Sequence, residues 1–352
     1  MAKTLTEEIR APLALYRAYR PSSFGDVRGQ EEVVSVLEAA LKKGDIAHAY
    51  LFSGGRGTGK TSMARIFARA LGTADEDIYE MDAASNRQVD DARALREGVA
   101  TLPFSSKYKV YILDEVHMFT KESWNTLLKT LEEPPAHAIF ILATTELDRV
   151  PETIQSRCQV FRFKKPSHDI LKKLVLDVAK KEGIVLEPAG AELIALMGDG
   201  SFRDTLGTLQ KVLTVSDDKK LSEAEVAKVV GAPASGVVND FLSGLAHGSA
   251  EDALAAFHTA LRAGAEPELF AMLAAARVRA VLLLRFAPKL RQELAEQFGP
   301  DDLALIEKFA GKEGAGINAA ALAELLTAII DTPRAPVPAL PLELALFRMF
   351  KQ

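Results

Sequence analysis

A glycine-rich segment, Gly54–Thr61, carries the strongest chemical signal in the sequence. It fits the pattern G-x-x-x-x-G-K-[ST], and it lies between an apolar run and a helical stretch, which is the context that a phosphate-binding loop needs. Glycines let the backbone curl so that its N–H groups point at phosphate oxygens. We expect Lys60 to reach the β- and γ-phosphates of a nucleotide and the Thr61 hydroxyl to bind Mg²⁺. The residues expected to surround the phosphates are Gly54, Gly55, Arg56, Gly57, Thr58, Gly59, Lys60, Thr61 and Ser62.

Two carboxylates, Asp114 and Glu115, follow the apolar run Val110–Leu113. A parallel strand places such residues at the carboxyl edge of its sheet, beside the phosphate loop. Asp114 is expected to hold the Mg²⁺, directly or through water, and Glu115 to accept a proton from the attacking water. The alternative is a solvated acidic loop, which the nearby phosphate loop makes less favoured.

Two further polar residues suit phosphate chemistry. Thr145 follows the apolar run Ile139–Thr144, and it is expected to hydrogen-bond the attacking water or the γ-phosphate unless it only satisfies the backbone at the strand end. Arg157 is a candidate to neutralise charge in the transition state, a role worth about 10³ to 10⁵ in rate in other enzymes. By spacing alone, a surface salt bridge is the favoured interpretation of Arg157.

Short apolar runs alternate with helical stretches in the first half of the chain, as in parallel βαβ units. The runs are nearly continuous, which is typical of strands covered on both faces. We therefore predict an α/β fold with a five-stranded parallel sheet. The expected strands are Ala49–Ser53, Ile78–Met81, Lys109–Asp114, Ile139–Thr144 and Val160–Phe163, with helices at Thr61–Leu71 and Lys121–Leu131.

After Pro166 the pattern is helical, with no convincing strand up to Val230. The segment Gly231–Gly236 is a predicted linker, and Gly299–Pro300 and Pro333–Pro341 interrupt the later helices. The expected domains are residues 1–166 for nucleotide binding, 167–232 for a small helical lid and 233–352 for a second helical domain.

The composition excludes several classes of protein. The 352 residues are 48% hydrophobic and 26% charged, unlike a disordered chain, a collagen or a disulfide-rich miniprotein. No apolar run approaches the roughly 20 residues of a membrane span, and the N-terminal residues lack a signal-peptide core, so we expect a cytoplasmic protein. The formal charge of −5 permits a local basic face for nucleic acid. One cysteine, Cys158, and six scattered histidines predict neither an internal disulfide nor a zinc site.

In combination, the motifs resemble the AAA+ clamp-loader ATPases, most closely the tau/gamma subunits of bacterial DNA polymerase III. The resemblance covers about residues 16 to 165 and is highly specific there; it extends to Gly200–Asp204, and beyond about residue 235 only a helical domain of suitable length remains. The segments that carry it are Tyr19–Gln30, His48–Thr61, Asp82–Asn86, Asp114–Met118, Leu127–Pro135, Ala143–Thr145 and Ser156–Cys158.

The resemblance implies roles that spacing does not show. Arg157 would act in trans, on ATP bound by a neighbouring subunit, and Arg203 would touch the γ-phosphate of its own ATP from the lid. Thr145 would sense the γ-phosphate. The adenine would lie near Tyr16, Arg17, Pro21 and Val27, and His48 would either border that pocket or be a hydrogen-bonded core histidine.

Two departures from the family stand out. Clamp-loader subunits of this kind carry a four-cysteine zinc module before the Asp82–Ser85 segment, whereas here Leu71–Ile78 bridges the interval without cysteine. We therefore expect ATP and Mg²⁺ as cofactors and no zinc. The chain stops at Gln352, so the long tau tail that binds helicase and polymerase is not expected in it.

The resemblance implies an ATPase motor subunit of the bacterial clamp loader, which places the sliding clamp on primed DNA during replication. Expected partners are the other subunits of a hetero-pentamer, the sliding clamp, primed DNA and the polymerase III core. Arg87 and Lys107 are candidate contacts to DNA phosphates, or else solvated surface charges. The alternatives are an AAA+ DNA motor of recombination, a non-hydrolysing scaffold subunit of the loader and, least favoured, an unfoldase.

Overall fold

The structure is a computed structural model that describes residues 13–85, 89–215 and 219–350. It contains two compact units, one extending to Leu174 with Gly198–Gln210 added, and one formed by Val175–Met197 and the chain from Lys211 onward. The helices α7 (His168–Lys181) and α9 (Phe202–Val215) belong partly to each unit. The division into three domains stays a prediction.

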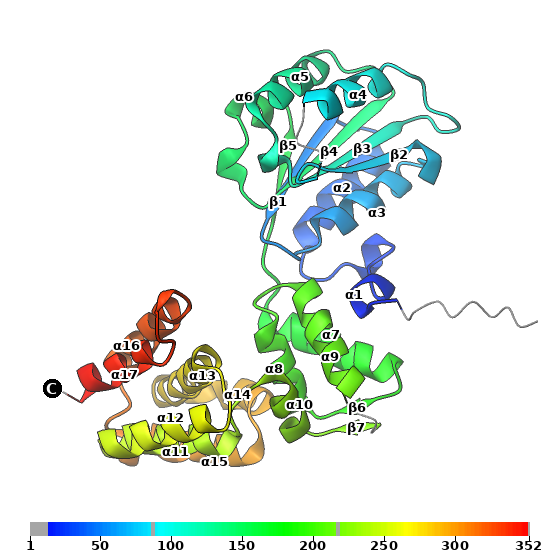
Figure 1. Ribbon diagram of the computed structural model, residues 1–352. Coiled ribbons are helices and arrows are strands. Elements are labelled where there is room, and N and C mark those ends of the chain that lie inside the picture. The colour runs from blue at the N-terminus through cyan, green and yellow to red at the C-terminus, as the bar shows by residue number, and fades with distance from the viewer. Residues whose placement is uncertain (1–12, 86–88, 216–218, 351–352) are drawn as a thin grey trace, which may run out of the picture. The chain divides into compact units, whose positions relative to one another are not determined.

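The first unit is built on a five-stranded parallel sheet with the strand order β2-β3-β4-β1-β5 (Figure 1). Each predicted strand is confirmed to within one residue at either end. Because all five strands are parallel, their carboxyl ends meet at one edge of the sheet, where the residues after β1, β3 and β4 come close together. The strands are β1 (Ala49–Gly54), β2 (Ile78–Asp82), β3 (Lys109–Asp114), β4 (Ala138–Thr144) and β5 (Gln159–Phe163).

Helices cover both faces of this sheet (Figure 1). On one face α2 and α3 enclose a core that includes Tyr50, Phe52 and Phe67, and on the other α4, α5 and α6 pack on Leu51 and Phe140. Successive residues of β1 thus point to opposite buried layers, which explains the continuous apolar runs. The helices of this unit are α1 (Leu15–Ala18), α2 (Glu31–Lys43), α3 (Lys60–Ala70), α4 (Val89–Val99), α5 (Lys121–Glu132) and α6 (Glu152–Gln155).

The connection from α3 to β2 is short. It consists of residues 71–74 and the 3-10 turn Asp75–Asp77, so the chain passes directly into the strand. Asp77 is fully buried there, and its carboxylate accepts hydrogen bonds from the backbone N–H groups of Ser105 and Ser106 at 2.9 and 2.8 Å and of Phe104 at 2.5 Å. This carboxylate therefore fixes the loop that leads into β3.

Asp77→Asn is expected to remove a pH-dependent part of the stability. Burial alone raises the pKa of Asp77, but hydrogen bonds from Ser105, Phe104 and Ser106 outweigh it and hold that pKa far below the usual range. The stabilisation is therefore complete above an unfolded-state pKa of about 3.9 and is lost as the pH falls toward the folded-state value. Below about pH 4 the free energy of unfolding should fall less steeply for Asp77→Asn than for the wild type in urea titrations.

Asp75→Asn is the matched control, because Asp75 lies in the same turn but its side chain is 74% exposed and pairs with Arg69 on the surface. Its stability should follow that of the wild type at every pH. An Asp77→Asn curve parallel to the wild-type curve would contradict the assignment.

The second unit is helical, and the helices from Ser235 to Met349 enclose a hydrophobic core formed mainly by α11, α12, α13, α16 and α17. The two-residue parallel strands β6 (Val185–Leu186) and β7 (Lys220–Leu221) correct the expectation that no strand occurs between residues 167 and 230. The predicted interruption at Gly299–Pro300 is confirmed, because one helix ends at Gln297 and the next begins at Pro300. The helices are α8 (Pro188–Met197), α10 (Glu223–Val230), α11 (Ser235–His247), α12 (Ala250–Arg262), α13 (Pro267–Phe286), α14 (Arg291–Gln297), α15 (Pro300–Ala310), α16 (Ala319–Asp331) and α17 (Leu340–Met349).

Within the described residues, no helix combines the length and the apolar character needed to cross a membrane.

Candidate nucleotide-binding site

The glycine-rich segment forms a tight loop between β1 and α3. Gly54 has φ of +154°, and a Cβ there would lie 2.5 Å from the carbonyl oxygen of Phe163. At Gly57, where φ is +71°, a Cβ would collide with the Ser201 side chain. Only glycine fits at either position, so the backbone of this loop is packed closely against its surroundings.

A buried glutamine, Gln30, ties this loop to the segment after β5. It is 4% exposed, and its Nε2 donates to the carbonyls of Lys164 at 2.8 Å and Thr58 at 3.5 Å. Its Oε1 accepts the N–H of Lys164 at 3.2 Å. Sequence reasoning placed Gln30 in a motif but gave it no role, since its partners lie far along the chain.

Lys60 is buried, with 5% of its surface exposed. Its Nζ donates to the carbonyl oxygens of Gly54 at 2.8 Å and Gly55 at 2.9 Å. Burial lowers the pKa of this ammonium, and the carboxylates of Glu115 and Asp114 partly oppose that effect. A phosphate would be a stronger partner than neutral carbonyls, because charge-assisted hydrogen bonds exceed neutral ones.

The two expected Mg²⁺ ligands meet at the sheet edge. The Thr61 hydroxyl donates to Oδ2 of Asp114 at 2.6 Å, and Oδ1 of Asp114 accepts the backbone N–H of Glu115 at 2.9 Å. A hydroxyl beside a carboxylate is the oxygen-only donor set that Mg²⁺ prefers. The residues present therefore fit the ion.

Glu115 adopts a left-handed backbone conformation, with φ of +49° and ψ of 42°. Such a conformation is uncommon outside glycine and is found at functional sites. Its carboxylate accepts a hydrogen bond from the Thr145 hydroxyl at 3.0 Å, so the two residues expected to handle the attacking water are in contact.

His117 lies between two carboxylates and was not singled out from the sequence. Its Nδ1 is 3.4 Å from Oε2 of Glu115 and 3.2 Å from the Thr144 hydroxyl, and its Nε2 is 3.4 Å from Oε1 of Glu146. The side chain is 7% exposed, which restricts its movement. In the sequence, the contact between His117 and Glu115 is indicated only by their separation of two residues.

The first turn of α9 adjoins the loop, and the N-terminal helix α1 adjoins that turn. The N–H of Phe202 donates to the carbonyl of Gly57 at 3.0 Å. The guanidinium of Arg203 lies over the Tyr16 ring, 5.6 Å from its centroid, and that of Arg17 lies 5.8 Å from it. The structure thus brings Tyr16, Arg17 and Arg203 together. Pro21 and Val27 are half-buried, and Val27 packs against the core beneath α2 and α3.

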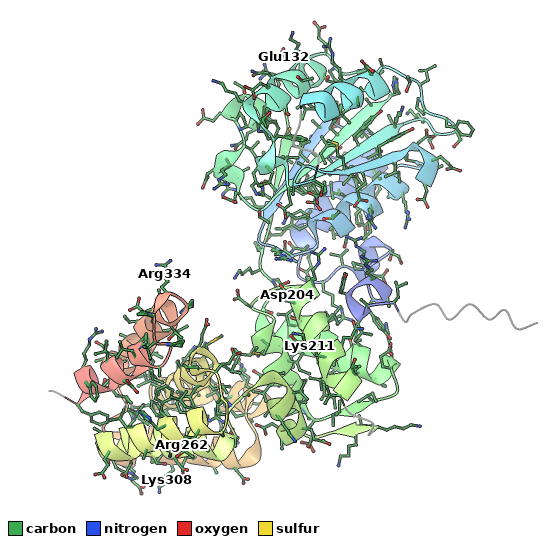
Figure 2. The ribbon with its side chains drawn as sticks, in the orientation of Figure 1. Glu132, Asp204, Lys211, Arg262, Lys308 and Arg334 are labelled. Atoms are coloured by element: carbon green, nitrogen blue, oxygen red, sulfur yellow. The ribbon has the colours of Figure 1, made fainter. Side chains whose placement is uncertain are left out.

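Other predicted residues lie elsewhere in the first unit. Arg157 precedes β5 and therefore lies at the amino edge of the sheet, opposite the phosphate loop. Its guanidinium donates to Glu132 on α5 at 2.7 Å and to the carbonyl of Thr153 at 2.6 Å (Figure 2 labels Glu132). Within one chain Arg157 thus forms the surface salt bridge that its spacing favours and does not reach the chain's own phosphate loop.

His48, directly before β1, and Lys107, two residues before β3, also lie at the amino edge. Among the described residues, the buried Nε2 of His48 has no hydrogen-bond partner, which does not fit a hydrogen-bonded core histidine. Its place beside the nucleotide stays a prediction. Lys107 is exposed, with its Nζ 4.8 Å from the centroid of the Tyr108 ring. Arg87 lies outside the described residues.

The strand order, the glycine-rich loop after β1 and the carboxylates after β3 define a P-loop nucleotide-binding domain of the AAA+ type. Solved structures share this fold: a RuvB Holliday junction branch migration motor from Thermotoga maritima is 21% identical with a TM-score of 0.52, and the match covers 84% of this chain and 86% of that chain. Identity at that level shows the fold alone.

Family models identify the chain more narrowly. The model described as DNA polymerase III, delta subunit, matches residues 29–87 and 74–167, and that of DNA polymerase III subunits gamma and tau domain III matches residues 221–352. The gamma/tau subunit of Mycobacterium tuberculosis is 38% identical over 299 residues, and the tau subunit of Escherichia coli is 34% identical over 323. The chain belongs to the family of DNA polymerase III gamma/tau subunits, as its motifs predict.

The chain spans about half the length of the curated relatives it matches. The alignments cover 78% of this chain and 52% of the Mycobacterium tuberculosis protein, and 83% of this chain and 50% of the Escherichia coli protein.

Proposed function

We propose that this chain is an ATPase motor subunit of a bacterial clamp loader, which uses ATP binding and hydrolysis to place a sliding clamp on primed DNA. The observation that supports this most directly is the meeting of the phosphate loop with Asp114, Glu115 and Thr145 at one sheet edge, in a chain of the gamma/tau family. The intact set of residues argues against a non-hydrolysing scaffold subunit.

In the proposed chemistry, Lys60 exchanges its two carbonyl partners for oxygens of the β- and γ-phosphates. Thr61 and Asp114 hold Mg²⁺, which supplies neutralising charge to the phosphates. Glu115 accepts the proton of the attacking water, and Thr145, already in contact with its carboxylate, orients that water or the γ-phosphate. The remaining glycines and Arg56, Thr58 and Ser62 line the phosphates.

The coupling to clamp loading would depend on the γ-phosphate. Arg203 would contact it from its own chain and Arg157 from a neighbouring subunit, so that hydrolysis removes a bridge between subunits. Only a contact that differs between the ATP and ADP states can shift an assembly in this way. The partners are then the other loader subunits, the sliding clamp, primed DNA and the polymerase core, with the C-terminal helices as a collar and the cytoplasm as the location.

The proposal is tested by the ATPase rate of the chain together with its partner subunits. We expect the rate to rise when both sliding clamp and primed DNA are added, and to rise less with either alone. Turnover that is independent of clamp and accompanied by strand displacement would select a DNA motor of recombination. Nucleotide binding without turnover under all these conditions would select a scaffold subunit.

A further inference from the structure

His117 lies against the carboxylate of Glu115, although the proposed chemistry gives it no role. The left-handed backbone at Glu115 turns the chain out of β3 and into a 3-10 turn, Val116–Met118. The N–H of Met118 donates to the carbonyl of Glu115 at 2.9 Å and closes that turn. The turn brings the imidazole back to the Glu115 side chain, with Nδ1 3.4 Å from Oε2. The uncommon conformation of Glu115 thus places a histidine beside its carboxylate.

The imidazole of His117 is held in place by its surroundings. The side chain is 7% exposed, and Nδ1 lies 3.2 Å from the hydroxyl of Thr144, a fully buried residue at the end of β4. That hydroxyl also accepts the N–H of Glu146 at 3.0 Å, which fixes its position. On the other side of the ring, the carboxylate of Glu146 is 46% exposed and also pairs with Arg149, so water weakens its attraction to Nε2. The contact of His117 with Glu115 is therefore the better shielded of the two.

Two contacts are directed at the same oxygen of Glu115. The Thr145 hydroxyl donates to Oε2 at 3.0 Å, and Nδ1 of His117 lies 3.4 Å from that atom. A carboxylate only accepts hydrogen bonds, so this position favours a hydrogen on Nδ1 of the imidazole. With Oε2 held in this way, Oε1 is the oxygen that can accept a proton from the attacking water. A general base needs such a fixed geometry, because a displacement of about 1 Å can cost about 10²-fold in rate.

We propose that His117 is a positioning residue of the ATPase site, which holds the carboxylate of Glu115 so that Oε1 faces the attacking water. This proposal rests on the proposed function and deepens it. It explains two observations together, namely the left-handed backbone of Glu115 and the nearly buried histidine whose Nδ1 faces a carboxylate. Because His117 acts on the base and not on the nucleotide, its loss should slow hydrolysis and leave ATP affinity unchanged.

The test is single-turnover hydrolysis of ATP by the chain assembled with its partner subunits, sliding clamp and primed DNA. The variants are His117→Asn and His117→Gln, because the amide nitrogen of asparagine lies as many bonds from the backbone as Nδ1, and that of glutamine as many as Nε2. His117→Gln should lower the rate constant about tenfold or more, whereas His117→Asn keeps a donor beside Glu115 and should stay within about threefold of the wild type. ATP titrations should give wild-type affinities for both variants.

A second measurement separates positioning from folding. In a Glu115→Gln background, His117→Gln should cause no further loss of rate, because the group that it positions is already gone. A single-turnover rate constant does not depend on the fraction of folded chain, so partial unfolding does not imitate the effect. His137→Gln is the matched control and should hydrolyse ATP like the wild type, since His137 is a half-buried histidine at the amino edge of the sheet, with its Nε2 3.1 Å from the carbonyl of Val99.

Three outcomes would overturn the role of His117: a His117→Gln assembly at the wild-type rate, equal losses in His117→Asn and His117→Gln, or a further loss in the Glu115→Gln background. In each case the wild type would still hydrolyse ATP, and the proposed function would stand. A wild-type assembly that bound ATP without hydrolysing it would overturn the proposed function and this proposal with it.

Discussion

Lys60→Ala should lower the affinity for ATP about 100-fold or more. The ammonium is buried and donates to two neutral carbonyls, so phosphate oxygens would replace both with charge-assisted bonds of about 1.5 to 3 kcal/mol each. Its loss therefore removes about 3 kcal/mol or more of binding free energy. The measurement is a titration with a fluorescent ATP analogue, with circular dichroism to confirm that the variant is folded.

Glu115→Gln separates binding from chemistry and is the comparison for Lys60→Ala. It should retain ATP, lose turnover by about 10²- to 10⁴-fold and trap the complex with clamp and DNA. Glu146→Gln is a suitable control, because Glu146 lies on the other side of His117 but is not assigned to the water. Equal losses of ATP affinity in Lys60→Ala and Glu115→Gln would show that Glu115 is misassigned.

Much of the first unit follows from the sequence because its signals are local. The strand β4 is buried along its whole length and is apolar at every position before Thr144, and so its limits are visible without any structure. The phosphate loop is contiguous, and Lys60 needs only the curl of its own segment to meet Gly54 and Gly55. To predict the contact between Thr61 and Asp114 from the sequence, one more assumption was needed, namely that the carboxyl ends of parallel strands meet at one edge of the sheet.

The residues that sequence reasoning missed depend on contacts between distant segments. His117 and Thr144 are 27 positions apart, and nothing local to either residue indicates the other. Gln30 and Lys164 are 134 positions apart. The motif of His48 adjoins the phosphate loop in sequence, but the length of β1 separates the two at opposite edges of the sheet. Two-residue strands such as β6 are too short to leave a pattern.

Arg157→Ala should lower ATP turnover by about 10³-fold or more in the assembled complex while leaving ATP affinity unchanged. The sheet topology excludes Arg157 from the chain's own site, because the amino end of β5 lies at the edge opposite the phosphate loop. The side chain is 34% exposed and pairs with Glu132, so it is accessible to a neighbouring subunit. Steady-state ATPase assays of the assembly, alongside ATP titrations, give the two quantities.

If the ion pair of Arg157 with Glu132 is only structural, variants of either residue should lose turnover; if Arg157 acts in trans, only variants of Arg157 should. Glu132→Gln breaks the same bridge but keeps the arginine, so it should retain turnover if Arg157 acts on a neighbour and should lose it if the bridge alone matters.

Assemblies that mix two variants give a sharper test. Assemblies of Arg157→Ala with Lys60→Ala chains should regain turnover, because an inactive Lys60→Ala site still offers its Arg157 to the adjoining chain. A double variant, Lys60→Ala with Arg157→Ala, should restore nothing. Mixed assemblies that stay inactive, or an Arg157→Ala assembly at full rate, would show that Arg157 forms only a surface salt bridge.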